Sequence, residues 1–565
     1  MTIRLAPDRD TARRLVAVAR RAQPADLVVS PGALLDVYSE EVLDGWGVVV
    51  AAGRIAYVGP DAGQFEAAAR IEGRDHILSP GLVEAHTHLL RLSLKNTMPL
   101  QVGLGITTTV FEAMELAFLL GPDAVRELLA EAAGVPGRAF FTVPPCVGFD
   151  PVHDRSLGPD QGWTELLELP GVAGVGECNW ADVVRGNHRV EALIERALAL
   201  GLTVEGHGAG IREPALNAFA APGMTADHEA IGPDDTLARL RLGLWSEVRQ
   251  GATRQDLQAI AELWKADVLG DASRLALVTD SVEADELTSG RSLNQAVDLA
   301  MASGLPLARA VRLASRNPAE RLGLGRWLGG LAPGMLADLV LVPRDGSSFR
   351  AELVMVGGAK PPAPSSHAYP SQMTDSVTLP EIDPAWLQHP GRGRWRALEV
   401  VAPLVTREAE SDGSDAITLV AIDRRGRRRG FRGLLTGFGL RGGACAASAA
   451  WDTPCLVAAG DSPGDLELAI RRLAEIRGGA VVVAGGAVKA EWRAELAGFL
   501  SLQPADNVVR EVRAVKAALN ELGSAWPNPL LTLEALTTAV IPQLRLSAEG
   551  YVRVRDRTTL GLAWS

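Results

Sequence analysis

The chain of 565 residues is poor in cysteine and in aromatic residues, and it lacks a long uncharged apolar run. Its four cysteines are widely scattered, so they form neither a zinc-finger spacing nor a disulfide framework. No stretch of about 18 uncharged apolar residues could span a membrane. Residues 1–21 have an amphipathic helix pattern instead of the continuous apolar core of a signal peptide. We therefore expect a reduced, cytoplasmic protein without a membrane span.

The sequence also lacks an excess of positive charge. Its formal net charge is −12 at pH 7 and no basic stripe is evident, which argues against nucleic acid as a partner. Hydrophobic residues make up 47% and charged residues 22%, as in a globular protein with room for two or three domains. We expect a small-molecule substrate and a homo-oligomer.

Histidine is scarce, with nine residues, which makes the His-x-His pair of His86 and His88 informative. The pair ends an apolar stretch that starts at Ile77. In a β-strand, residues i and i+2 point to the same face, so both imidazoles can bind one metal ion from one side. Taken alone, a His-x-His pair is explained by packing or chance at least as often as by a metal site.

Further potential ligands each follow a short strand-like run downstream. Taken singly, each could be a turn residue, a solvated strand end or a helix cap. Their joint occurrence at strand ends favours a metal site, and imidazole and carboxylate ligands suit Zn, Mn or Fe. A bridging carboxylate would let the set hold two metal ions. The predicted metal ligands are His86, His88, Glu177, His207, His228 and Asp280.

Strand-like runs alternate with amphipathic helix patterns over the same region. This alternation predicts parallel β/α units, and about eight units predict a (β/α)8 barrel, whose active site forms where its strands end. Helices are predicted at 122–133, 189–200, 255–268 and 293–302. Strands are predicted near 82–86, 106–111, 138–143, 172–177, 202–206, 224–227, 243–247 and 274–280.

The ligand order resembles the amidohydrolase superfamily, and more narrowly the bacterial adenine deaminase family. The similar phrases include Pro80-Gly81-Leu82-Val83-Glu84-Ala85-His86-Thr87-His88, Asp227-His228-Glu229 and Val278-Thr279-Asp280. The resemblance extends to Leu434-Leu435-Thr436-Gly437, which is similar to the opening of that family's C-terminal domain. It implies a metal-dependent barrel in which Glu177 bridges two divalent metals, Mn, Fe or Zn, and which deaminates adenine.

The loops around the predicted ligands depart from the family pattern. Leu89-Leu90-Arg91-Leu92 and Ser281-Val282-Glu283-Ala284 replace the residues that the family has after the second His and after the eighth strand. The metal shell is kept while the substrate-facing positions change, which puts adenine in question more than hydrolysis. The predicted contacts to a ring edge are Arg91, Arg249, Ser281 and Glu283, although each could instead be a surface charge.

The domain boundaries are predicted from the Gly turns and a Pro/Ser stretch. Residues 1–76 hold an N-terminal helix and the first part of a small β-sandwich, and 77–330 form the barrel. Residues 331–360 return as strands of the sandwich, as the family resemblance implies. Residues 361–374 form a linker, and 375–565 form a C-terminal α/β domain.

These residues indicate a hydrolytic function. Asp280, beside the metal, is the natural proton shuttle, and Glu229 is a second catalytic acid or orienting residue, or else a helix N-terminal carboxylate. The favoured hypothesis is deamination of adenine, to hypoxanthine and ammonia, or of a related aminated heterocycle. The alternatives are a metal-dependent hydrolase of cyclic amides and a catalytically impaired paralogue.

Overall fold

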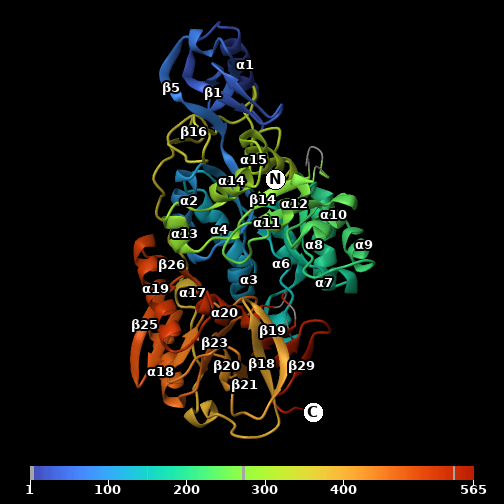
Figure 1. Cartoon of the computed structure of the whole chain (residues 1–565), viewed down its shortest axis with the longest axis vertical. Coiled ribbons are helices and arrows are strands. Elements are labelled where there is room, and N and C mark those ends of the chain that lie inside the picture. Colours follow the sequence, from blue (N-terminus) through green and yellow to red (C-terminus); the bar gives the residue numbers. More distant parts are fainter. Residues whose placement is uncertain are drawn as a thin grey trace.

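The computed structural model describes residues 5–148, 151–266, 268–269, 274–538, 541 and 543–564. A β-sheet covered by helix α1 (Arg9–Ala19) lies at one end of the long axis, the barrel in the middle and the C-terminal domain at the other end (Figure 1). Helix α1 begins after Asp8, whose carboxylate accepts a hydrogen bond from the N–H of Thr11. It falls within the predicted amphipathic segment, of which residues 1–4 are outside the described part.

Parallel strands, whose order in the sheet follows the chain, form the barrel. The eighth predicted strand is interrupted at Thr279, and its second piece pairs in parallel with the first barrel strand, which closes the ring. Asp280 stands there with a φ of 62°, a conformation that L-residues rarely adopt. The predicted barrel is confirmed, and its strands are β6 (Leu82–His88), β8 (Ile106–Glu112), β9 (Arg138–Val143), β10 (Val172–Asn179), β11 (Thr203–His207), β12 (Ala226–Asp227), β13 (Trp245–Arg249), β14 (Leu275–Val278) and β15 (Asp280–Ser281).

The helix predicted over 255–268 is divided into α11 (Leu257–Ile260) and α12 (Glu262–Lys265), and its Asp267 lies outside the described residues. Both short helices bury apolar side chains in the same cluster as helix α14 (Leu293–Ala302). The apolar spacing of this segment therefore reflects burial rather than one continuous helix. The other predicted segments form α4 (Pro122–Ala132), α8 (His188–Leu200) and α14 (Leu293–Ala302). Further barrel helices are α2 (Leu94–Gly103), α3 (Met114–Leu120), α7 (Trp180–Arg185), α10 (Pro233–Arg241), α13 (Ala284–Thr288), α15 (Leu307–Leu313) and α16 (Arg316–Arg321).

Strands from both sides of the barrel in the chain meet in one mixed sheet, where the family resemblance implied a small β-sandwich. Asp338 fixes the returning chain to the barrel, because its carboxylate binds Arg138 at 2.5 Å and accepts from the N–H of Gly357 at 2.9 Å. Asp338 therefore has a structural role. The sheet contains β1 (Ala25–Asp36), β2 (Glu41–Asp44), β3 (Gly47–Ala51), β4 (Arg54–Gly59), β5 (Ala67–Pro80), β16 (Leu339–Pro343) and β17 (Leu353–Met355).

The C-terminal domain is a largely antiparallel sheet with helices packed against it. Its strand order is β19-β18-β21-β20-β23-β22-β24-β25. These strands are β18 (Trp395–Ala402), β19 (Val405–Ser411), β20 (Ile417–Asp423), β21 (Gly430–Thr436), β22 (Ala444–Ala447), β23 (Cys455–Gly460), β24 (Gly479–Ala484) and β25 (Ala487–Arg493), and the helices are α18 (Pro463–Glu475), α19 (Ala505–Glu521) and α20 (Pro529–Glu534).

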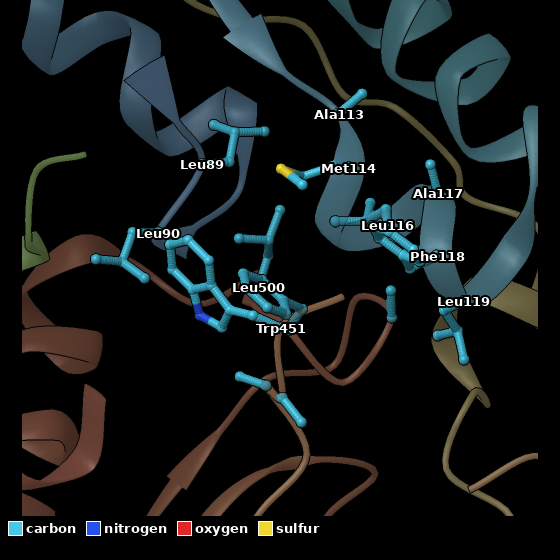
Figure 2. Packing of buried hydrophobic residues seen from close by; sticks show 14 of the residues in the cluster. Leu89, Leu90, Ala113, Met114, Leu116, Ala117, Phe118, Leu119, Trp451 and Leu500 are labelled. Atoms are coloured by element: carbon cyan, nitrogen blue, oxygen red, sulfur yellow. The ribbon is translucent and has the colours of Figure 1, made fainter. Parts of the chain in front are cut away.

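Apolar packing joins this domain to the barrel. Figure 2 shows Leu89, Leu90 and Met114 of the barrel near Trp451 and Leu500 of the C-terminal domain, and all five belong to one buried cluster. Backbone pairing continues the contact, because β7 (Arg91–Leu92) pairs in parallel with β26 (Leu500–Ser501). No helix in the described part of the chain is long and apolar enough to cross a membrane.

Candidate active site

The predicted metal ligands converge at one end of the barrel. They lie in or directly after the strands, at the carboxyl ends that a parallel barrel gathers at one mouth. The positions follow from the alternation of side chains along each strand, which sends His86 and His88 of β6 to the same face. The six side chains, all almost completely buried, are His86, His88, Glu177, His207, His228 and Asp280.

The first group of facing atoms comes from β6, β10 and β15. Glu177 Oε1 lies 3.4 Å from His86 Nε2 and 3.0 Å from His88 Nε2. Asp280 Oδ1 lies 3.4 Å from each of the same nitrogens. These four ligand atoms lie within 4.8 Å of one another, a spacing that could hold a metal ion.

A second group lies beside the first. His207 Nε2 and His228 Nε2 are 3.4 Å and 3.6 Å from Glu229 Oε1, and these three residues could also hold a metal ion. His228 Nε2 lies 3.5 Å from Glu177 Oε1, so Glu177 is within reach of both groups. Glu229, predicted from the sequence as a catalytic residue, therefore stands directly at the cluster.

Carboxylates hold the far nitrogens of these imidazoles. Glu115 pairs with His88 Nδ1, and Glu205 Oε1 lies 2.9 Å from His86 Nδ1 and 3.3 Å from His228 Nδ1. Metal-binding histidines are commonly oriented in this way by an acceptor behind the ring. Arg321 pairs with Glu205 from the opposite side and keeps its charge balanced.

The donor set fits a cation. Burial would lower the pKa of His86 and His88, yet the surrounding carboxylates outweigh it and raise both pKa values well above the ordinary range. Neither ring nitrogen of His86 forms a well-aligned hydrogen bond with a described residue, although four carboxylates approach these nitrogens to 2.9–3.6 Å. A cluster of this kind needs positive charge, which bound metal ions would supply.

A cavity of about 210 Å³ lies against the cluster. This volume is below the roughly 300–1,000 Å³ of sites for drug-sized ligands, so the cavity suits a small ring. Its wall comes from both domains, with Met114, Thr253 and Arg254 on the barrel side and Leu404, Trp451 and Leu531 on the other. The Trp451 ring stands 5.4 Å from that of His88, between centroids.

Arg249 is the one predicted ring-edge contact that lines this cavity among its described residues. Its guanidinium pairs with Glu229 and lies 3.8 Å from Asp280 Oδ2, while Asp256 binds it from behind at 2.9 Å. Burial would raise the pKa of Glu229, but Arg249, His207 and His228 together outweigh it and bring that pKa below its ordinary range. Arg249 thus pairs with one predicted catalytic carboxylate, Glu229, and lies near the other, Asp280.

The structure places the other three predicted ring-edge contacts away from the cavity lining. Arg91 points to the C-terminal domain, where its Nη1 binds Glu534 Oε1 at 2.6 Å. Glu283 lies 3.6 Å from the Arg91 Nε and 3.3 Å from Lys516 Nζ. Ser281 donates a hydrogen bond to Thr253 at 3.3 Å. None of the three is a surface charge, since all are buried.

Sequence reasoning did not identify several residues of the site. Glu205 stands two positions before His207 on β11, so strand alternation was a usable signal for it. Trp451 and Thr253 carried no signal, because nothing local shows that they reach the cavity.

The comparisons with known proteins agree with these features. The model of the adenine deaminase C-terminal domain matches residues 396–558, and that of the amidohydrolase family matches residues 190–360. The chain is 33% identical to the adenine deaminase of Deinococcus deserti, with 96% of each chain covered. It is 31% identical to the adenine deaminases of Moorella thermoacetica and Archaeoglobus fulgidus, with 97% of each chain covered.

Proposed function

Because the chain belongs to the adenine deaminase family, we propose that it is a hydrolase that removes the amino group of adenine or a closely related aminated heterocycle. With adenine the products are hypoxanthine and ammonia. The observation that carries the proposal is that a small cavity lies directly against the His/Glu/Asp cluster. A homo-oligomeric state and a cytoplasmic location stay predictions.

The cluster is proposed to hold two divalent metal ions, Mn, Fe or Zn, with Glu177 shared between them. His86, His88 and Asp280 would complete one site, and His207 and His228 the other. The fit rests on the buried imidazole and carboxylate donors described above and on their excess of negative charge. When bound, such ions supply a nucleophilic hydroxide near neutral pH by lowering the pKa of water.

The side chains of this protein would then move and hold the protons. Asp280 accepts the proton of the attacking water and passes it to the departing amino nitrogen, which leaves as ammonia. Glu229, held by Arg249, accepts a hydrogen bond from an N–H of the ring or its amino group. The indole of Trp451 and the neighbouring apolar side chains confine the ring beside these groups.

The test is a screen for ammonia release over adenine, other purines and pterins, with separate Mn-, Fe- and Zn-loaded preparations. We expect adenine or a related aminated ring to release ammonia in at least one preparation. A ring-opened acid formed from a cyclic amide, without ammonia from any aminated ring, would instead support the second hypothesis. Lack of both products would favour the impaired paralogue.

A further inference from the structure

The loop after β13 is fixed to the end of the eighth barrel strand. The N–H of Ala252 donates to the carbonyl of Ser281 at 2.8 Å, and Gln250 and Gln255 form a bridge that closes the loop. A Cβ on Gly251 would lie 2.0 Å from the carbonyl oxygen of Thr279, so only glycine permits this close approach. The loop is thereby held over the strand that carries Asp280.

Thr253 is the side chain that this loop presents to Asp280. Its Oγ1 donates to Asp280 Oδ2 at 2.6 Å, and it accepts from Ser281 Oγ at 3.3 Å. A hydroxyl has one proton, and an ionised carboxylate only accepts, so the donor order runs from Ser281 through Thr253 to Asp280. Ser281, predicted as a ring contact, is the outer member of this chain.

The hydrogen bond fixes which oxygen of Asp280 faces the metal cluster. With Oδ2 held by Thr253, Oδ1 points to His86 Nε2 and His88 Nε2, at 3.4 Å from each. Asp280 also has a left-handed backbone, a conformation that persists only where its surroundings hold it. Arg249 is 3.8 Å from Oδ2, beyond hydrogen-bonding distance, so Thr253 makes the closest polar contact to that oxygen that the structure records.

We propose that Thr253 is a positioning residue that orients Asp280 for proton transfer. The inference rests on the proposed function, because it assigns Asp280 the role of proton shuttle. A competing explanation is that Thr253, which lines the cavity, contacts the substrate directly. The two explanations differ in whether the loss of the hydroxyl changes kcat or KM.

The decisive comparison is between Thr253→Val, which keeps the shape and removes the donor, and Thr253→Ser, which keeps the donor. In the metal-loaded enzyme acting on its best aminated ring, we expect Thr253→Val to lower kcat about ten- to hundredfold, as for losing a hydrogen bond to a charged group. We expect KM and metal content, measured by mass spectrometry, to stay near those of the wild type, and Thr253→Ser to restore most of the rate. A raised KM with unchanged kcat would overturn the proposal.

A crystal structure of metal-loaded Thr253→Val gives a readout that does not depend on activity. We expect the Asp280 carboxylate to rotate away from its wild-type orientation, and an unmoved carboxylate would overturn the proposal. If Thr253→Val does not fold, Thr253→Ala removes the same donor without adding an apolar group. The results expected of Thr253→Val, a lower kcat and a rotated Asp280 carboxylate, are then expected of Thr253→Ala. If the wild type releases ammonia from no ring, the proposed function fails, whereas the Asp280 orientation still tests Thr253.

Discussion

Arg91→Met should show how strongly the C-terminal domain is held to the barrel. Arg91 is completely buried, binds Glu534 at 2.6 Å, and lies 3.6 Å from Glu283. Met has a similar length and the same backbone restrictions as Arg, so the strain of the φ of 69° at this position is unchanged. The substitution removes the cation and leaves two buried carboxylates, of which Glu283 alone retains polar partners among the described residues, Lys516 and Asn528.

Removing one member of a buried ion pair costs about 3–5 kcal/mol, so we expect a loss of that size in the free energy of unfolding at pH 7. Urea-induced unfolding followed by tryptophan fluorescence measures it. Arg394→Met is the matched control, because it removes an exposed pair with Glu410 and should leave the transition unchanged. A loss below about 1 kcal/mol for Arg91→Met would refute the reasoning, since it would lie in the range of a surface pair.

The pH dependence provides a second check with a defined sign. Burial raises the pKa of Glu283, but Arg91 and Lys516 outweigh it and bring the pKa to about 2, from an ordinary value of 4.5. The wild type therefore gains stability from this group above about pH 4.5 and loses it as the pH falls towards 2. Without Arg91 this gain in stability is smaller. The difference in the free energy of unfolding between wild type and Arg91→Met should therefore become smaller as the pH falls. A difference that widens would contradict the assignment.

Two further predictions concern the cavity. Asp280→Asn should keep the fold and most of the metal but lower turnover by about 10²-fold or more, the range for removing a general acid or base, and unchanged turnover would reject that role. Trp451→Ala should raise KM for a planar ring by up to about tenfold, because a stacked aromatic pair contributes about 0.5–1.5 kcal/mol, whereas Trp451→Phe should change it little. Equal KM values for the wild type and Trp451→Ala would show that the indole does not contact the ring.

The barrel and the convergence of the proposed ligands could be predicted because their signals are local. Each ligand follows a short apolar run, and a parallel barrel brings all such strand ends to one mouth, so six residues spread from His86 to Asp280 converge without any knowledge of long-range contacts. The return of β16 to the N-terminal sheet was implied by resemblance rather than by pattern. The break between α11 and α12 was missed because apolar spacing reports burial, and both short helices are buried on the same side.

The roles of Arg91 and Glu283 could not be predicted for a different reason. Loop residues that follow a ligand usually face the cavity, and both were interpreted in that way. Their actual direction depends on Glu534 and Lys516, which lie far along the chain in another domain. No local pattern reports such a pairing. Thr253 was missed likewise, because its contact with Asp280 requires the closed loop that Gly251 makes possible.

The lining of the cavity is divided between the barrel and the C-terminal domain. All the predicted metal ligands and both predicted catalytic carboxylates lie in the barrel, whereas Leu404, Trp451 and Leu531 of the opposite wall belong to the C-terminal domain. Substitutions in that wall can change the shape of the cavity without moving a ligand. The buried pair of Arg91 with Glu534 then has a functional consequence, because it fixes the position of this wall relative to the cluster. We therefore expect the ring that the enzyme accepts to depend on how the two domains are joined as well as on the loops of the barrel.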